Sequence, residues 1–262
     1  DFYRCESDGV CEGERERSVI YTSDAVLDPE ESTTWNVGMV WQITEAFDFT
    51  ADVWSIKQDN KIDQNPVENI YAAECGNQDS IICQRFEPLP GETLGQIDKI
   101  YNVYVNLSSQ EASGLDVTAG YVVDLVDLGT IKFGLDWSYI DSFKKDNLQY
   151  AGELNYPQHR GRLSVDWAYN DFGLTSIFKY IGEFESYQAL SVMESSKATM
   201  VDSQTLVDVQ GHYNLNDKTT LTIGVNNLFD TDPPFTDRGY GYVAETHSLR
   251  GQYVYGSVKY KF

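Results

Sequence analysis

Long stretches in which apolar and polar residues alternate constrain the fold of this chain more than any other feature. From Leu115 to Leu125 and from Ile131 to Tyr139 every second side chain is apolar, and the intervening residues are mostly Asp, Lys, Thr, Ser or Gly. A period of two puts alternate side chains on opposite faces of a β-strand, and helical periodicity is almost absent. Nine such runs predict nine strands, at residues 35–43, 47–53, 115–125, 131–139, 163–169, 174–187, 207–215, 221–225 and 254–262.

The connections between the predicted strands alternate between short and long. Tight turns are expected at residues 44–46, 126–127, 170–171 and 216–218, and long loops at residues 59–99, 144–157, 188–203 and 229–249. Short turns at one end and long loops at the other are typical of an outer-membrane β-barrel, whose periplasmic turns are short. Most of the runs approach the nine to eleven tilted residues that cross a hydrocarbon layer, whereas strands of globular proteins average about five or six.

Two folds compete for this pattern. In a soluble β-sandwich the apolar faces pack against each other and the polar faces meet water. In a transmembrane barrel the apolar faces meet lipid and the polar faces line a wet lumen. We favour the barrel because the runs are long and their polar faces carry Asp, Lys, Gln and Asn. The 18 Tyr, 12 Phe and 5 Trp also recur near strand ends, as in the aromatic girdles of such barrels.

The net charge of −22, from 41 acidic and 19 basic side chains, excludes electrostatic binding to nucleic acid because phosphates would be repelled. No apolar run approaches the ~18 residues of a transmembrane helix. Residues 1–31 hold ten acidic and three basic side chains and residues 59–99 hold eight and three, so these segments supply −12 of the charge. We predict that both are acidic extracellular loop segments. They either attract cationic ligands or divalent ions that bridge lipopolysaccharide, or simply form a solvated surface.

The four cysteines fall into two close pairs in these loop segments: Cys5 with Cys11, and Cys75 with Cys83. We predict that each pair forms a disulfide bond that cross-links its own loop segment, because export passes through an oxidising compartment. The alternatives are a metal site and free thiols. A metal site is disfavoured because neither pair has Cys-x-x-Cys spacing and the three histidines are distant in sequence.

No convincing catalytic site is found in the sequence. Ser164, Asp166 and His159 could form a triad on paper, but the sequence lacks a nucleophile elbow. A Walker loop and a dinucleotide fingerprint are also missing. We therefore predict no catalytic, cofactor-binding or metal-binding residues and no enzymatic activity, with a barrel enzyme as the least favoured alternative.

Four segments resemble TonB-dependent outer-membrane receptors. Residues 220–230, followed by Pro233 and Pro234, look like the penultimate-strand motif of that family, and residues 256–262 resemble its last strand, including the terminal Phe262. Residues 106–116 are similar to a stretch where a long family strand descends through a glycine. Residues 27–32 resemble the pattern L-x-P-E-x-S that precedes a family strand. The matches extend from residue 27 to residue 262.

This resemblance implies an all-β fold, an antiparallel transmembrane β-barrel in the bacterial outer membrane with the C-terminus on the periplasmic side. Residues 1–262 would form a partial barrel domain, the nine C-terminal strands of a probable 22-stranded barrel, with the plug domain absent. Nine strands alone leave two long unpaired edges, which lipid does not tolerate, and bacterial single-chain barrels have even strand counts. We therefore expect a C-terminal fragment of a longer polypeptide.

The function implied by the resemblance is that of a receptor and transporter that takes up a scarce ligand with energy derived from TonB. The ligand would be a siderophore, cobalamin or an oligosaccharide. The implied partners are outer-membrane lipid and lipopolysaccharide, the remainder of the barrel and its plug, TonB, the barrel-assembly machinery and the small-molecule ligand. The alternative is a passive porin-type channel or a structural outer-membrane barrel.

Two sets of residues are candidates for function. Aromatic residues of the long loops are candidates for ligand contact: Tyr71, Phe86, Tyr150, Tyr187, Phe235 and Tyr240. Val258, Tyr260 and Phe262 resemble the C-terminal assembly signal of outer-membrane barrels, because an edge strand with alternate apolar residues can be recognised by strand addition. Alternatively, these three residues only fill the lipid-facing aromatic girdle.

Overall fold

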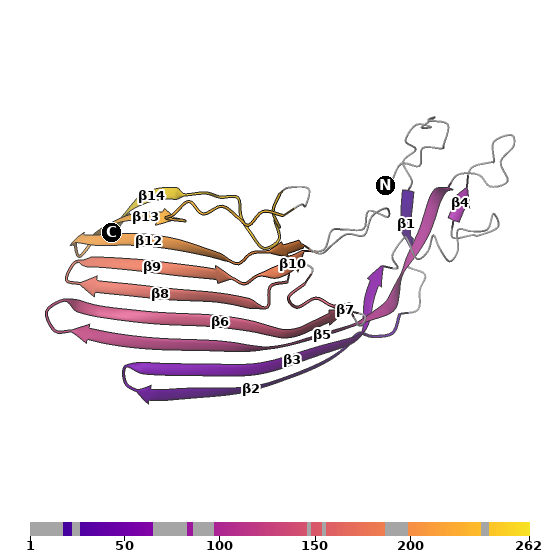
Figure 1. The fold of residues 1–262 in the computed structure, drawn as a ribbon, viewed down its shortest axis with the longest axis horizontal. Helices are drawn as coiled ribbons and strands as arrows, with labels where there is room; N and C mark the ends of the chain where they lie inside the picture. Colours follow the sequence, from indigo (N-terminus) through magenta and orange to yellow (C-terminus); the bar gives the residue numbers. More distant parts are fainter. Residues whose placement is uncertain are drawn as a thin grey trace. The chain divides into compact units, whose positions relative to one another are not determined.

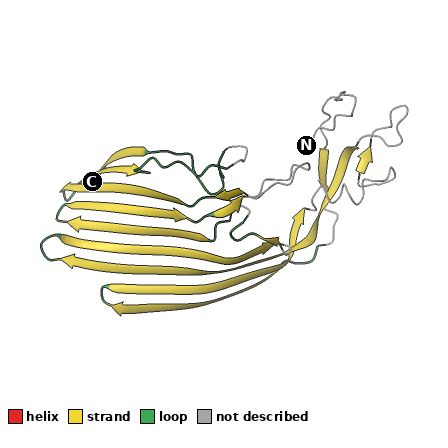
Figure 2. Ribbon diagram, in the orientation of Figure 1, coloured by secondary structure: helices red, strands yellow, loops and turns green. Residues whose placement is uncertain are grey.

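A computed structural model of the chain describes residues 18–22, 27–64, 83–85, 97–145, 148–153, 156–186, 199–236 and 241–262. This part of the chain consists of strands and their connections (Figure 2). Within it, no helix is long and apolar enough to cross a membrane.

The described strands are numbered in chain order in Figure 1. They are β1 (Ser18–Thr22), β2 (Glu31–Thr44), β3 (Phe47–Gln64), β4 (Cys83–Arg85), β5 (Ile97–Leu125), β6 (Gly129–Lys145), β7 (Leu148–Gln149), β8 (His159–Tyr169), β9 (Phe172–Ile181), β10 (Phe184–Ser186), β11 (Thr199–Val201), β12 (Gln204–Asn216), β13 (Thr219–Asn226) and β14 (Tyr253–Tyr260).

Nine of these strands form one continuous path in the order β14-β13-β12-β9-β8-β6-β5-β3-β2 (Figure 1). Each predicted run contributes one strand to this path, so the prediction of nine strands is confirmed. The sandwich alternative is wrong, because the only other sheet among the described residues is the two-stranded pair β10-β11. The predicted tight turns are confirmed as well, since register pairs such as Leu125↔Gly129 and Tyr169↔Phe172 close them. The left-handed φ angles that such turns require fall on Gly129 (84°) and Asn170 (50°).

The chain divides into two compact units. One contains Asp1–Glu31 and Gln58–Ser109, and the other contains Ser32–Lys57 and Gln110–Phe262. In the first unit, β1 pairs with β5 in parallel, from Ser18↔Lys99 to Thr22↔Val103, and β4 pairs with β5 in the antiparallel sense. Neither β1 nor β4 is predicted from the alternation, because each is short.

Several strand bounds differ from the predictions, and the differences at β3, β5 and β9 change which segments are loops. β3 continues to Gln64 and β5 begins at Ile97, so both strands extend into the segment predicted as a loop at residues 59–99. The run at 174–187 is not one strand: β9 ends at Ile181, and β10 pairs separately with β11. A backbone ladder does not require apolar side chains, so apolar alternation marks a strand only where one face is buried or meets lipid.

A small buried cluster lies outside the main sheet. Phe184 of β10, Val201 of β11 and Val243 of the connection between β13 and β14 are at most 1% exposed. By contrast, every residue of β2 is exposed. The main sheet therefore does not enclose a dry core in this chain, and its apolar face must be explained by something other than internal packing.

Candidate functional site

The main sheet has one apolar face whose large side chains are exposed. The register places Val117, Trp137 and Tyr180 in one row across β5, β6 and β9, and Leu221 opposite Val258 on β13 and β14. Large apolar residues of this face remain substantially exposed: Tyr121 (46%), Phe133 (37%), Ile223 (65%) and Val258 (70%). A continuous exposed apolar surface of this kind is unusual for a protein that meets water, and it fits contact with lipid.

Aromatic residues form a row near each end of this face. Near the tight turns, Phe172 and Tyr213 lie 4.5 Å apart and Trp167 stacks on Tyr169 at 6.1 Å. Near the other end, Trp137 stacks on Tyr180 at 5.5 Å. Next to that pair, Tyr139 stacks on His159 at 4.7 Å.

The separation of these aromatic rows matches the thickness of a membrane. On β8 the rows pass through His159 and Tyr169. Ten residues at ~3.3 Å each span about 33 Å along a strand, which is about 25 Å across a layer if the strand is tilted by ~40°. That height agrees with the apolar band of outer-membrane barrels.

The opposite face of the sheet is polar and cross-linked by hydrogen bonds between strands. Four of its carboxylates have a partner on a neighbouring strand. Ser138 Oγ donates to Asp116 Oδ1 (2.6 Å), Thr175 Oγ1 donates to Asp166 Oδ1 (2.6 Å), Thr130 Oγ1 donates to Asp124 Oδ1 (2.7 Å), and Lys179 forms an ion pair with Asp208. These four carboxylates therefore have partners within the sheet. This face has the character of a hydrated barrel wall. His159 and Ser164 lie on opposite faces of β8, so Ser164, Asp166 and His159 do not form a catalytic triad.

The C-terminal hairpin presents the three residues of the predicted assembly signal on the apolar face. Val258, Tyr260 and Phe262 are 70%, 53% and 109% exposed, and the rings of Tyr260 and Phe262 meet edge to face at 5.3 Å. β14 is one end of the strand path, so in the described part of the chain one of its edges has no partner strand. The role of Val258, Tyr260 and Phe262 as an assembly signal remains a prediction.

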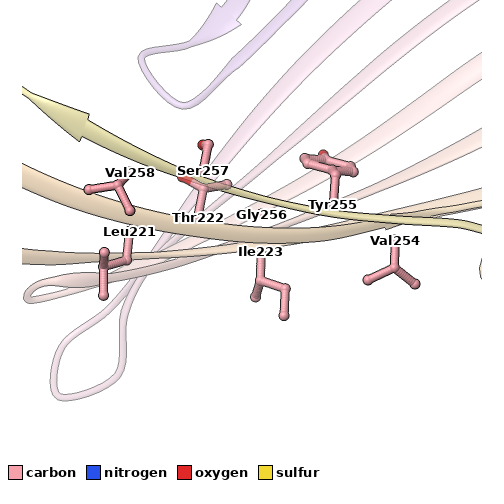
Figure 3. Close-up of a pocket in the computed structure, with 8 residues that line it drawn as sticks. All are labelled: Leu221, Thr222, Ile223, Val254, Tyr255, Gly256, Ser257 and Val258. Atoms are coloured by element: carbon pink, nitrogen blue, oxygen red, sulfur yellow. The ribbon is translucent and has the colours of Figure 1, made fainter.

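An open groove lies between β13 and β14 (Figure 3). Figure 3 shows the side chains of Leu221, Ile223 and Val254 on one side of the hairpin and those of Tyr255 and Ser257 on the other. Gly256 stands opposite Ile223 in the register and has no side chain to fill the apolar side. The missing side chain leaves a gap beside Ile223, and the polar side-chain groups that line the groove are the hydroxyls of Thr222, Tyr255 and Ser257.

The sequence Asn-Asn-Leu-Phe-Asp at residues 226–230 forms a turn at the end of β13 that is held by hydrogen bonds of Asn227 and Asp230. Asn227 is 5% exposed with a φ of 50°, a left-handed conformation that Asn tolerates. Its Nδ2 donates to the Thr231 carbonyl (3.0 Å), its Oδ1 accepts from the Thr231 N–H (2.9 Å), and its own N–H donates to Asp208 Oδ1 (2.9 Å). Asp230 then accepts from the N–H of Gln252 (2.7 Å). This motif turns the chain out of β13 and returns it to β14.

The connection from β13 to β14 also contains a buried histidine. The His247 ring is 6% exposed and stacks on Phe184 at 5.9 Å, and its Nδ1 shares a hydrogen bond with Thr246 Oγ1 (2.8 Å). Burial lowers the pKa of His247 below its ordinary value, a backbone hydrogen bond to Val243 opposes this shift, and the charge of Arg160 adds to it. Among the described residues, Nε2 of His247 is buried without a hydrogen-bond partner, in keeping with the dominant effect of burial on this ring.

Only two of the predicted ligand-contact residues lie in the described part of the chain. Phe235 is 75% exposed, and Tyr150 packs against Phe143 and Tyr156. No ring contact joins Tyr150 to Phe235, although the structure describes both. The other four candidates, Tyr71, Phe86, Tyr187 and Tyr240, lie outside the described residues.

The cysteine pairs are tested only in part by the structure. Cys83 is on β4 and is 1% exposed, while Cys5, Cys11 and Cys75 lie outside the described residues. The two disulfide pairings therefore remain predictions. In the described ranges, no group of three or more His, Cys, Asp or Glu side chains is placed to hold a metal ion.

Known structures share this fold. The chain superposes on the pyoverdine outer membrane receptor FpvA from Pseudomonas aeruginosa with a TM-score of 0.61 and 14% identity, covering 92% of this chain and 31% of that one. It superposes on the siderophore receptor PirA from Acinetobacter baumannii with a TM-score of 0.65 and 17% identity, covering 90% and 32%. For the FrpB iron transporter from Neisseria meningitidis the TM-score is 0.60 at 13% identity, covering 94% and 32%. The chain thus spans about a third of the length of these proteins.

A comparison with curated proteins finds no match. The family model described as TonB dependent receptor-like, beta-barrel, matches residues 15–228, which is most of the chain. The match agrees with the nine-stranded antiparallel path, the exposed apolar face and the motif that follows β13. This chain belongs to the TonB-dependent receptor family of outer-membrane transporters, which are not enzymes, and it forms part of their β-barrel domain.

Proposed function

We propose that this chain is part of the wall of an outer-membrane receptor that takes up a ferric siderophore with energy derived from TonB. The observation that carries the proposal is the two-faced sheet, with two aromatic rows on the exposed apolar face and a hydrogen-bonded polar face behind it. The apolar face meets lipid and lipopolysaccharide acyl chains, and the polar face lines a wet lumen.

In this proposal the tight turns face the periplasm and the long connections face the outside. The C-terminus lies beside a tight turn, because the N–H of Lys261 donates to the carbonyl of Lys218 (2.9 Å). It would therefore be periplasmic. The acidic segments at residues 1–31 and 59–99 would belong to the extracellular side.

The relatives support a siderophore more than the other two ligand classes that the sequence suggests, cobalamin and oligosaccharides. The receptors that share this fold include a pyoverdine receptor, a siderophore receptor and an iron transporter. A ferric siderophore is therefore favoured over cobalamin and oligosaccharides. The plug and the remainder of the barrel would lie in parts of the receptor outside these 262 residues, and TonB would be a separate partner protein.

The test is uptake of radiolabelled iron by cells that express the protein from its own gene under iron limitation. We expect saturable uptake of ferric siderophore that stops when either this gene or TonB is removed, because release from such a receptor requires TonB-derived energy. Uptake that needs the gene but persists without TonB would contradict the proposal and indicate a passive porin-type channel. Saturable, TonB-dependent uptake of cobalamin or an oligosaccharide would leave the receptor assignment standing and overturn the siderophore.

A further inference from the structure

Three aromatic rings surround the ammonium group of Lys145 at the end of β6, one from β6 itself and two from the connection to β8. Lys145 Nζ lies 5.3 Å from the ring centroid of Phe143, 5.4 Å from that of Tyr150 and 5.9 Å from that of Tyr156. All three distances are within the ~6 Å at which a cation is attracted by the negative face of a ring. The rings are inclined to one another by 54°, 64° and 85°, so they stand as separate walls and do not stack.

The rings are held in place by contacts that do not involve Lys145. The side-chain carbonyl oxygen of Gln149 accepts hydrogen bonds from the N–H groups of both Phe143 (3.0 Å) and Tyr150 (3.2 Å). The N–H of Tyr150 also donates to the carbonyl of Phe143 (2.7 Å), and Tyr156 forms an isolated β-bridge with Ala151. These bonds fix the backbone that carries the rings, which lowers the entropic cost of holding a cation among them.

Within the described residues, the three rings are the partners of the Lys145 ammonium group. In the part of the chain that the structure describes its ammonium forms no ion pair, whereas the adjacent Lys144 pairs with Glu111 Oε1 at 3.0 Å. Tyr156, one wall of the site, is 38% exposed, so the site opens to solvent. A lysine on a flexible four-carbon stem can leave such a site without breaking a salt bridge.

We propose that Phe143, Tyr150 and Tyr156 form an aromatic cage that binds the alkylammonium group of a small ligand, and that Lys145 fills this cage in the present structure. The ligand's ammonium replaces that of Lys145, so the lysine acts as an internal competitor. Aromatic cages of this kind attract quaternary ammonium groups because a weakly hydrated cation loses little on leaving water. The net charge of −22 raises the local concentration of cations at the surface. This site does not depend on energy from TonB, and it adds a recognition element to those of the proposed uptake function.

The test is titration of the purified protein in detergent with tetramethylammonium chloride, followed by ligand-observed NMR. Lys145→Gln empties the cage, and Lys144→Gln is the matched control because it removes the same charge from the next residue. We expect Lys145→Gln to bind the cation at least fivefold more tightly than wild type, Lys144→Gln to bind it as wild type does, and Tyr150→Leu combined with Tyr156→Leu to lose binding.

A neutral probe of the same shape, tert-butanol, separates cation recognition from simple apolar contact. Weaker binding of tert-butanol than of tetramethylammonium by Lys145→Gln supports the cage. Equal binding of the two probes overturns the proposal, and so does a Lys145→Gln variant that gains no affinity over Lys144→Gln. The heat-modified electrophoretic shift of folded barrels shows that each variant remains folded during the titration.

Discussion

Among single residues, three strand glycines each lie under an aromatic ring of a neighbouring strand. Tyr255 lies over Gly224, Trp137 lies over Gly161 and His212 lies over Gly173, each from a neighbouring strand. A glycine inside a strand normally weakens it, because it has no side chain to pack. Here the missing side chain leaves room for a large ring from the next strand, as in the aromatic rescue of glycine in β-sheets.

The prediction at this scale compares two glycines of the C-terminal hairpin. A Cβ at Gly224 would meet the ring of Tyr255, whose hydroxyl donates to Gln210 Oε1 (2.9 Å), whereas a Cβ at Gly256 would meet only the Thr222 carbonyl at 3.6 Å. We expect Gly224→Ala to destabilise the folded barrel by about 1–3 kcal/mol through overpacking, and Gly256→Ala to change it by less than about 0.5 kcal/mol. The midpoint of the heat-induced electrophoretic shift measures both. Equal midpoints for the two variants would show that a methyl group at residue 224 does not disturb the packing of the Tyr255 ring.

At the scale of elements, the connections between strands carry their own packing. The connection from β13 to β14 docks on β10 through Val243 and His247, which contact the cluster containing Phe184 and Val201. Gln204, at the start of β12, donates to the carbonyl of Asp232 in the same connection (3.0 Å). The conformation of this connection is therefore set by the neighbouring strands as well as by the motif that follows β13.

Acidification should loosen this connection. The pKa of His247 is lowered by burial from its ordinary value of 6.5, so the unfolded segment takes up a proton more readily than the docked one. Neutral His247 therefore stabilises the docked connection, and this contribution is fully present above the ordinary pKa. It is lost as the pH falls below that value and through the lowered pKa of the docked state. We expect amide hydrogen exchange at residues 243–248, corrected for intrinsic rates, to be faster at about pH 5.5 than at about pH 7.5.

Two variants separate this effect from general acid sensitivity. His247→Phe keeps an aromatic ring against Phe184 and removes the titration, so its exchange should lose the pH dependence. His212→Gln changes a histidine on the polar face of β12 and should keep that dependence. An unchanged pH dependence in His247→Phe would rule out His247 as the titrating group.

At the scale of the whole molecule, the main sheet in this chain has two ends. β2 and β14 terminate the strand path, and both carry exposed side chains along their length. Unpaired strand edges cannot remain in contact with hydrocarbon, because their N–H and C=O groups would lack partners. The two edge strands are therefore the places where the remainder of a closed barrel would be joined.

The prediction at this scale concerns Phe262. If the assembly machinery recognises the last strand, deleting Phe262 should lower the amount of folded protein in the outer membrane several-fold. The ligand affinity of the folded fraction should stay unchanged. Phe172→Ala is the matched control, because Phe172 is 54% exposed in the aromatic row near the tight turns and has no terminal position. Membrane levels are measured by quantitative immunoblotting after outer-membrane isolation. A loss of the same size in both variants would indicate that Phe262 serves only the girdle.

Much of the fold could be predicted from local pattern alone. Alternation between Leu115 and Tyr139 identified β5 and β6, their tight turn and their two faces, because lipid on one side and water on the other impose a period of two on every strand that crosses the membrane. The extension of β5 back to Ile97 lacks a clean alternation, because the apolar or aromatic residues Ile100 and Tyr104 lie next to Tyr101, Val103 and Val105. β1 and β4 are too short for periodicity to detect.

The nine strands of the main path, their apolar and polar faces and the family resemblance follow from the amino-acid sequence, because each depends on residues that are neighbours along the chain. Which side chains meet across strands is known only from the three-dimensional structure. The cage of Phe143, Tyr150 and Tyr156 around Lys145, and the burial of His247 against Phe184, bring together residues from separate elements. Such contacts depend on register and on how the connections dock, and neither is encoded in the spacing of residues along one strand.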